Sequence, residues 1–337
     1  MEQGFHVPSY AKPFEELHDA QLDHFWRPPG SSKFSKDGSQ WMSLSYGVKR
    51  RLKGVVHVLT RMEPEVIENA EDIQSLCKRV IPPKTLIDLA IMGIMTDSFK
   101  AMEGTHIRSY GTIDSVLYLV LEDKDKEAFT TFIKSKVDVI SKWRSSEDNT
   151  DNLPHQLSRA ILGNVFSEGL VFNTLFSTFS VPKKDGILET TCQTNDEVLA
   201  DENIHTRGFI TMYIILIELG LIPRLSQEEV YEMLADFIAV DDMCAAWLLG
   251  NMNENEKEFF LVMTEENARI YTRIVANYVL KALQYDTLYP YTKEDNPYPF
   301  IKQSLINTLG YFFDKTVVEY GLKVDHDYES DSDLDDE

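Results

Sequence analysis

Residues 101–110 read AMEGTHIRSY and place a carboxylate, an imidazole and a phenol within one long apolar segment. Side chains three, four and seven positions apart share a helical face, so Glu103, His106 and Tyr110 should stack over two turns. The flanking residues are apolar around nearly the whole circumference, which is typical of a helix buried in a core: Leu86, Ile87, Ile91, Ile94, Met95, Phe99, Met102, Ile113 and Leu117. A buried Glu and a buried His each need a partner, and a metal ion suits both. The stretch therefore predicts a metal site inside a helical core.

The composition limits the class of protein. The chain has 337 residues, 43% of them hydrophobic, which is enough for one large domain or two ordinary ones. A formal net charge of −22 argues against a nucleic-acid-binding surface. No apolar run has the length of a membrane span, and the N-terminus has no signal-peptide core, so we expect neither membrane insertion nor secretion. Three widely spaced cysteines without a CxxC pattern indicate a reducing, cytoplasmic setting: Cys77, Cys192 and Cys244.

The pattern of breaks suggests one large domain between two polar ends. Residues 1–40 are expected to be irregular, because prolines and a glycine interrupt any period there: Pro8, Pro13, Pro28, Pro29 and Gly30. Residues 41–320 are expected to form a single helical domain. Residues 321–337 form an acidic tail, which we expect to be disordered.

Helical periodicity accounts for almost all of that domain, and strand patterns are nearly absent, so the predicted class is all-α. Pro64 should bend or end the first long helix. Ser226 and Glu229 fit a capping box at the start of a later helix. The predicted helices cover residues 46–63, 64–80, 84–121, 125–143, 157–180, 195–221, 226–249 and 256–285, with a last helical stretch near Tyr320.

Glu202 and His205 repeat the Glu-x-x-His spacing on a second apolar helix. Two such pairs, joined by a lone Glu from each of two other helices, form the dinuclear site of ferritin-like bundles. The carboxylates offset the repulsion between two cations, and one nitrogen per metal leaves open positions for O2. We therefore predict a ferritin-like helical bundle with a dinuclear metal site. A third match, from Glu15 to His18, lies in the polar N-terminal segment and is interpreted as chance.

The lone carboxylates of such a site have candidates on two further helices. Glu168 lies on an apolar face, where an acid without a partner would be costly. Glu63 falls on the apolar face of the first long helix, directly before Pro64. Three other acids are near enough to compete with Glu63 as the ligand: Glu65, Glu68 and Asp72.

The phenol of Tyr110 distinguishes this pattern from that of a generic dinuclear oxidase. Phe172 and Phe176 follow Glu168 on the same helical face, one and two turns later, and Val198 precedes Glu202 by one turn. All three side chains could therefore shield the phenol. A shielded phenol beside an oxidising metal pair is suited to losing an electron and a proton. The alternative is a core tyrosine that forms a hydrogen bond with a ligand.

With these motifs in place, the sequence resembles the radical-generating small (β) subunit of class I ribonucleotide reductase. The resemblance runs from about residue 25 to residue 320. Its ordered motifs are FWRP at 25–28, SKD at 35–37, Glu103-x-x-His106-x-x-x-Tyr110, Asp201-Glu202-x-x-His205, NPYPF at 296–300 and FFDKTVVEY at 312–320. Glu168 stands 34 residues before Glu202, as in the family pattern.

The resemblance implies a ribonucleoside-diphosphate reductase with two iron ions, or manganese and iron. The implied ligands are Glu63, Glu103, His106, Glu168, Glu202 and His205. O2 activation would generate a tyrosyl radical at Tyr110, in a pocket formed by Phe172, Phe176 and Val198. Trp26, Asp201 and His106 would begin the radical-transfer route, and Tyr320 would pass the oxidation to the large (α) subunit, where ribonucleotides are reduced. The acidic tail would dock on that subunit, and a homodimer is expected.

Several alternatives remain open from the sequence. The family's first ligand is usually Asp; counting forward from Trp41 selects Glu63, whereas counting back from Glu103 selects Asp72. Tyr328 could serve as the relay instead of Tyr320. A ferritin-like oxidase or desaturase would use the same ligands but would have no use for Trp26, Tyr110 and a C-terminal tyrosine. A catalytically silent regulatory paralogue is the remaining alternative. The metal, the choice of diphosphate or triphosphate substrate, the reductant and the source organism are left open.

Overall fold

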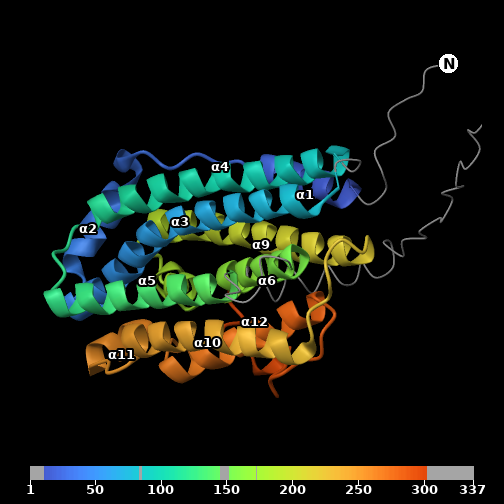
Figure 1. The fold of residues 1–337 in the computed structure, drawn as a ribbon. Coiled ribbons are helices and arrows are strands. Elements are labelled where there is room, and N and C mark those ends of the chain that lie inside the picture. Colours follow the sequence, from blue (N-terminus) through green and yellow to red (C-terminus); the bar gives the residue numbers. More distant parts are fainter. Residues whose placement is uncertain (1–10, 83–85, 145–151, 172, 302–337) are drawn as a thin grey trace, which may run out of the picture.

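The structure is a computed structural model that describes residues 11–82, 86–144, 152–171 and 173–301. Within these ranges every long element is a helix and no strand is present (Figure 1), which confirms the predicted all-α class. The elements are α1 (Lys12–Asp23), η1 (Ser31–Phe34), α2 (Ser35–Ser43), α3 (Tyr46–Val80), α4 (Leu86–Val116), α5 (Asp123–Arg144), α6 (Leu153–Leu170), α7 (Asn173–Thr178), α8 (Ser180–Lys184), α9 (Glu189–Glu218), α10 (Gln227–Leu249), α11 (Glu254–Phe260), α12 (Glu265–Ala282) and η3 (Lys293–Asp295).

Four long helices, α3, α4, α6 and α9, surround the interior of the bundle. Both α3 and α9 pack against α4 and α6, so the four helices form a closed ring. On one side α1 packs against α4 and α9, and on the other α10 and α12 pack on α6 (Figure 1). In the ranges that the structure describes, no helix is long and apolar enough to cross a membrane.

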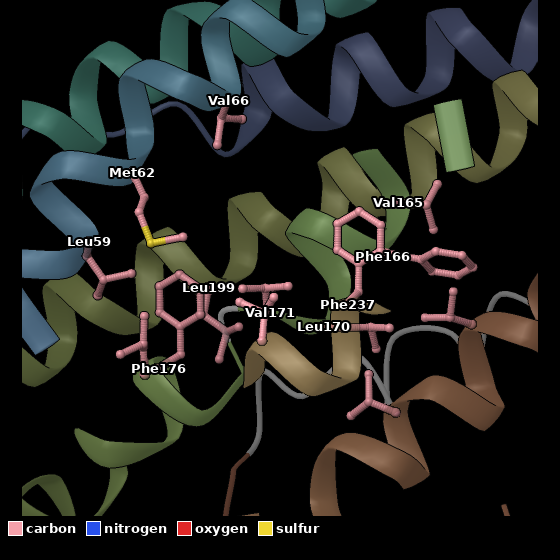
Figure 2. Close-up of a cluster of buried hydrophobic side chains, with 14 of the residues drawn as sticks. Leu59, Met62, Val66, Val165, Phe166, Leu170, Val171, Phe176, Leu199 and Phe237 are labelled. Carbon is pink, nitrogen blue, oxygen red and sulfur yellow. The ribbon is translucent and has the colours of Figure 1, made fainter. Parts of the chain in front are cut away.

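Buried apolar side chains line much of the ring of helices. Figure 2 shows buried side chains of several helices, among them Met62 of α3 and Leu199 of α9, with Phe166 of α6 beside Phe237 of α10. Residues 160–170 of α6 are all buried. Burial of each large apolar side chain contributes about 1.5–3 kcal/mol. A charged side chain that faces this interior therefore lies in water-excluded surroundings and needs a specific partner.

The N-terminal segment differs from its prediction. Residues 1–40 were expected to be irregular, which is wrong for the described part, because α1, η1 and α2 lie within residues 12–43. Pro13 occupies the first turn of α1, where a proline removes no helical hydrogen bond. Phe14, Leu17 and Gln21 recur at helical spacing and are buried. Packing of this face against α4 and α9 stabilises a helix that the prolines had obscured.

Pro64 was expected to bend or end the first long helix. It does not end that helix. Instead, α3 runs through Pro64 without a break and is 35 residues long in total. A proline inside a helix costs about 3 kcal/mol. Buried residues on both sides of it, including Met62 and Val66, pack into the interior and outweigh that cost.

Two predicted helices are divided in the structure. The helix predicted at 157–180 becomes α6, α7 and α8; the Asn173 side chain donates to the backbone oxygen of Gly169 at 2.8 Å and so competes with helical bonding. The helix predicted at 256–285 is divided at Leu261, whose φ of 49° lies in the left-handed region. Ser226 caps α10 as predicted, whereas the Glu229 side chain bonds Arg159 of α6. The helical stretch predicted near Tyr320 lies outside the described residues.

Candidate metal centre

Four helices bring six ionisable side chains into the interior of the ring. One comes from α3, one from α6, and two each from α4 and α9, where Glu-x-x-His spacing places both on one face. All six are at most 3% exposed: Glu63, Glu103, His106, Glu168, Glu202 and His205.

These side chains form two adjacent groups of possible metal ligands that share Glu202. Within each group, one ligand atom per residue lies within 4.8 Å of all the others; the groups are Glu63, Glu103, His106 and Glu202, and Glu168, Glu202 and His205. Glu103 also reaches both histidines, with its two carboxylate oxygens 3.1 Å from His106 Nδ1 and 2.9 Å from His205 Nδ1. The imidazole centroids are 6.1 Å apart. The geometry is that of two neighbouring cation sites, each with one nitrogen, and with two carboxylates between them.

The donor atoms fit a pair of metal ions. Among the described residues, neither carboxylate oxygen of Glu63 has a hydrogen-bond partner of acceptable geometry, and neither does Oε2 of Glu168. A buried carboxylate without such a partner costs several kcal/mol unless a cation compensates it. Carboxylate oxygens together with imidazole nitrogens are ligands that suit iron and manganese.

Burial and neighbouring charges shift the pKa values of Glu63, Glu168 and the two histidines strongly. Burial raises the pKa of Glu63 well above its usual range, and the charge of Glu103 adds to this. Burial likewise raises the pKa of Glu168 to about 8, although the charge of His205 opposes it. Burial alone would lower the pKa of both histidines, but the surrounding carboxylates, Glu103 above all, raise it well above 6.5. Without metal the site therefore holds protons, and metal binding should release them.

Asp201 connects the ligand His106 to the edge of the bundle. Its Oδ2 accepts hydrogen bonds from Trp26 Nε1 at 2.7 Å and from His106 Nε2 at 3.0 Å. Its Oδ1 accepts from Gln21 Nε2 at 2.7 Å, and the imidazole of His24 lies 3.8 Å away. With Nε2 bound in this way, His106 presents Nδ1 to the carboxylates. The structure thus brings together the three residues expected to begin the transfer route.

Tyr110 is fully buried on α4, one turn beyond His106. Its hydroxyl donates to Asn195 Oδ1 of α9 at 3.2 Å. Burial raises the pKa of Tyr110 well above 10, and the charge of Glu63 adds to this, so the phenol stays protonated. Val198 and Phe176 are also buried, whereas Phe172 lies outside the described residues.

The competing acids on α3 do not join the cluster. Asp72 lies more than two helical turns beyond Glu63 and is half-buried, and Glu68 is exposed. Glu65 is half-buried and belongs to neither ligand group. Tyr320, Tyr328 and residues 321–337 lie outside the described residues.

The sequence matches a known protein family over most of its length. The model of the family described as "Ribonucleotide reductase, small chain" matches residues 8–297. The chain belongs to this family. The small chain is accordingly part of an oxidoreductase, ribonucleoside-diphosphate reductase, as the sequence predicted.

Two curated relatives carry that name. The ribonucleoside-diphosphate reductase small chain of Spisula solidissima is 22% identical over 290 residues, which cover 85% of this chain and 68% of the relative. That of Trypanosoma brucei brucei is also 22% identical over 290 residues, covering 84% of this chain and 77% of the relative.

Solved structures share the fold at lower identity. The ribonucleotide reductase R2 subunit from Clostridium botulinum has a TM-score of 0.65 and 17% identity, covering 89% of this chain and 88% of that one. The dimanganese(II)-NrdF of Streptococcus sanguinis has the same TM-score and identity, covering 91% and 99%. With the carboxylate and histidine cluster, these likenesses confirm the predicted ferritin-like bundle for the small chain.

The sequence analysis missed several polar residues around the site. Gln21 and Asn195 bind predicted residues from other helices, so only their spacing on a buried face could have indicated them. Asn164 lies one turn before Glu168 and donates to its Oε1 at 2.6 Å. Lys136 of α5 is buried in an apolar stripe; burial lowers the pKa of its ammonium to about 8, while the charges of the Glu63 and Glu168 carboxylates oppose the shift.

Proposed function

We propose that the small chain binds two iron ions, or one manganese and one iron, and generates a tyrosyl radical at Tyr110. The carrying observation is the pair of buried ligand groups that share Glu202, with a buried phenol on the same helix as Glu103 and His106. When bound, such a metal pair supplies with O2 an oxidant able to remove one electron from a phenol. The ligands are Glu63, Glu103, His106, Glu168, Glu202 and His205.

The surroundings of Tyr110 suit a radical that must persist. The phenol, Val198 and Phe176 are at most 2% exposed, so water and small reductants are kept from the ring. Phe172, which we also assign to this pocket, is the second residue after the end of α6 in the sequence. A phenoxyl enclosed in this way can be formed in one reaction and used in a later one.

The contact of Trp26, Asp201 and His106 supports a route for the oxidation out of the core. Asp201 accepts hydrogen bonds from both the indole and the imidazole, so it fixes their relative position. The ring centroids of Trp26 and His106 are 6.2 Å apart and the planes are inclined by 21°. If Trp26 is oxidised, the Asp201 carboxylate can hold the indole proton that is released.

The large (α) subunit is the proposed recipient of the radical. Tyr320 would relay the oxidation to it, and the acidic residues 321–337 would dock on its surface. The large subunit would then reduce ribonucleoside diphosphates to deoxyribonucleotides. We also propose that the small chain forms a homodimer and works in the cytoplasm.

Replacement of Tyr110 by Phe tests the proposal. After aerobic reconstitution with iron, Tyr110→Phe should keep the metal content of the wild type but show no radical EPR signal and no deoxynucleotide formation with the large subunit. Tyr213→Phe is the matched control, because Tyr213 is a fully buried tyrosine that bonds Tyr285 instead. A radical signal that survives in Tyr110→Phe would refute the assignment.

A further inference from the structure

The pocket around Tyr110 contains a polar side chain in contact with the phenolic oxygen. Asn195 of α9 accepts a hydrogen bond from the Tyr110 hydroxyl at 3.2 Å, across 85 residues of sequence. Asn195 is 1% exposed and Tyr110 is fully buried. An aliphatic side chain at this position would complete an apolar pocket, so the amide needs a specific explanation.

The orientation of the Asn195 amide is set by a second contact. Its Nδ2 donates to the backbone oxygen of Phe176 at 3.2 Å. A backbone oxygen can only accept, so Nδ2 must face Phe176 and Oδ1 must face the phenol. Tyr110 is therefore the donor in its bond to Asn195. An amide oxygen accepts hydrogen bonds but is too weak a base to take the proton.

We propose that Asn195 is a positioning residue that binds Tyr110 as a phenol and offers no hydrogen bond to the corresponding radical. The inference rests on the proposed radical function of Tyr110 and adds the partner that tunes it. In the reduced state the hydroxyl proton lies between Tyr110 and Asn195. The amide thereby stabilises the phenol relative to the radical.

Oxidation changes this contact in a definite way. Tyr110–OH gives one electron and one proton to the oxidant of the proposed function, which is reduced by that amount, and Tyr110–O• remains. The phenoxyl oxygen can only accept, and it still faces Oδ1 of Asn195, which also only accepts. Nδ2 cannot replace Oδ1 without breaking its bond to Phe176. The radical should therefore lack a hydrogen bond from Asn195.

The first test uses the full-length, metal-free protein and does not require a radical. Tyrosines labelled with 13C at Cζ report the hydrogen bonding of each hydroxyl by NMR, and the Tyr110→Phe spectrum assigns the Tyr110 resonance. Asn195→Leu should shift that resonance and speed exchange of the hydroxyl proton with solvent at least tenfold. Thr194→Val is the matched control, because the neighbouring Thr194 hydroxyl donates to the backbone oxygen of Thr190 in its own helix. An unchanged Tyr110 resonance in Asn195→Leu would overturn the proposal.

The second test uses the reconstituted protein and covers the case in which Asn195→Leu does not fold. In the wild type, high-field EPR and deuterium ENDOR after exchange into D2O should show a radical without an exchangeable hydrogen-bonded deuteron. Asn195→Asp places a carboxylate at the same position, which can take up the phenol proton. The protonated carboxyl should then donate a hydrogen bond to the radical. This bond should add the deuteron coupling and lower the largest g value. A strongly coupled deuteron in the wild type would overturn the proposal. Absence of any radical in the wild type would instead refute the proposed function and leave the NMR test to decide the role of Asn195.

Discussion

One carboxylate oxygen of Glu168 accepts a hydrogen bond from a residue of the same helix. Asn164, one turn earlier on α6, donates from Nδ2 to Glu168 Oε1 at 2.6 Å, while Oε2 lies 3.8 Å from His205 Nδ1. A hydrogen bond to an ionised ligand orients it and contributes about 1.5–3 kcal/mol. The contact leaves Oε2 as the oxygen that is free to bind a cation.

Asn164→Leu should therefore weaken metal binding. Loss of the donor leaves Glu168 Oε1 buried without a partner, so we expect affinity for Mn(II) to fall by about 10- to 100-fold. Titration of the metal-free protein with Mn(II), followed by EPR of the free ion, measures this affinity. Ser167→Ala alters a neighbouring buried side chain that has no hydrogen-bond partner among the described residues, and it should leave the affinity unchanged. Equal affinities in Asn164→Leu and the wild type would contradict the orienting role.

The choice between Glu63 and Asp72 is also a question about single residues. Glu63 lies in the ligand cluster, whereas Asp72 is half-buried further along α3. Glu63→Gln keeps the shape of the side chain but removes its charge, so it should lower metal occupancy. Asp72→Asn should leave occupancy at the wild-type level. Elemental analysis after reconstitution measures the metal occupancy of both variants. Normal occupancy in Glu63→Gln together with lowered occupancy in Asp72→Asn would identify Asp72 as the ligand.

At the scale of elements, Asp241 joins three helices away from the metal site. From α10 it accepts hydrogen bonds from Thr174 Oγ1 of α7 at 2.9 Å and from Thr272 Oγ1 of α12 at 2.6 Å. It is fully buried, and burial raises its pKa from 3.8 to about 7. The folded chain therefore binds this proton more tightly than the unfolded chain does.

This shift predicts a pH-dependent effect of Asp241→Asn. Between about pH 4 and pH 7 the unfolded chain loses the proton first, so the contribution of Asp241 to stability falls as pH rises and is gone above pH 7. Asn cannot ionise, so at pH 8 the variant should have a free energy of unfolding higher by on the order of 4 kcal/mol. Near pH 4 it should have no such advantage. Urea unfolding of the metal-free proteins at both pH values measures the difference, and an advantage independent of pH would contradict the assigned pKa.

The elements also show what the sequence could and could not predict. Apolar periodicity and Glu-x-x-His spacing are local, so they predicted α4, α9 and the placing of Glu103 with His106 on one face. They did not predict α1, because Pro13 suggests a helix break in the sequence, although it lies in the first turn of an amphipathic helix. They also did not predict the break near Asn173, whose side chain binds a helical carbonyl oxygen. Contacts between helices, such as that of Asn195 with Tyr110, depend on packing distances that a single sequence does not contain.

At the scale of the whole molecule, the bundle encloses a concentration of charge. Four carboxylates converge in the interior of a ring of helices whose other buried side chains are largely apolar. Such an interior is costly without compensating cations, which relates the stability of the fold to its cofactor. Family membership, the ligand cluster and the buried phenol all fit a radical-generating small chain.

The measurement that tests this account most directly is metal analysis combined with EPR on aerobically reconstituted wild-type protein. The account predicts two metal ions per chain and a radical signal whose hyperfine structure changes when the tyrosines are deuterated at the β-carbon. Protein that binds less than one ion per chain, or that binds two ions and forms no tyrosine-derived radical, would contradict it.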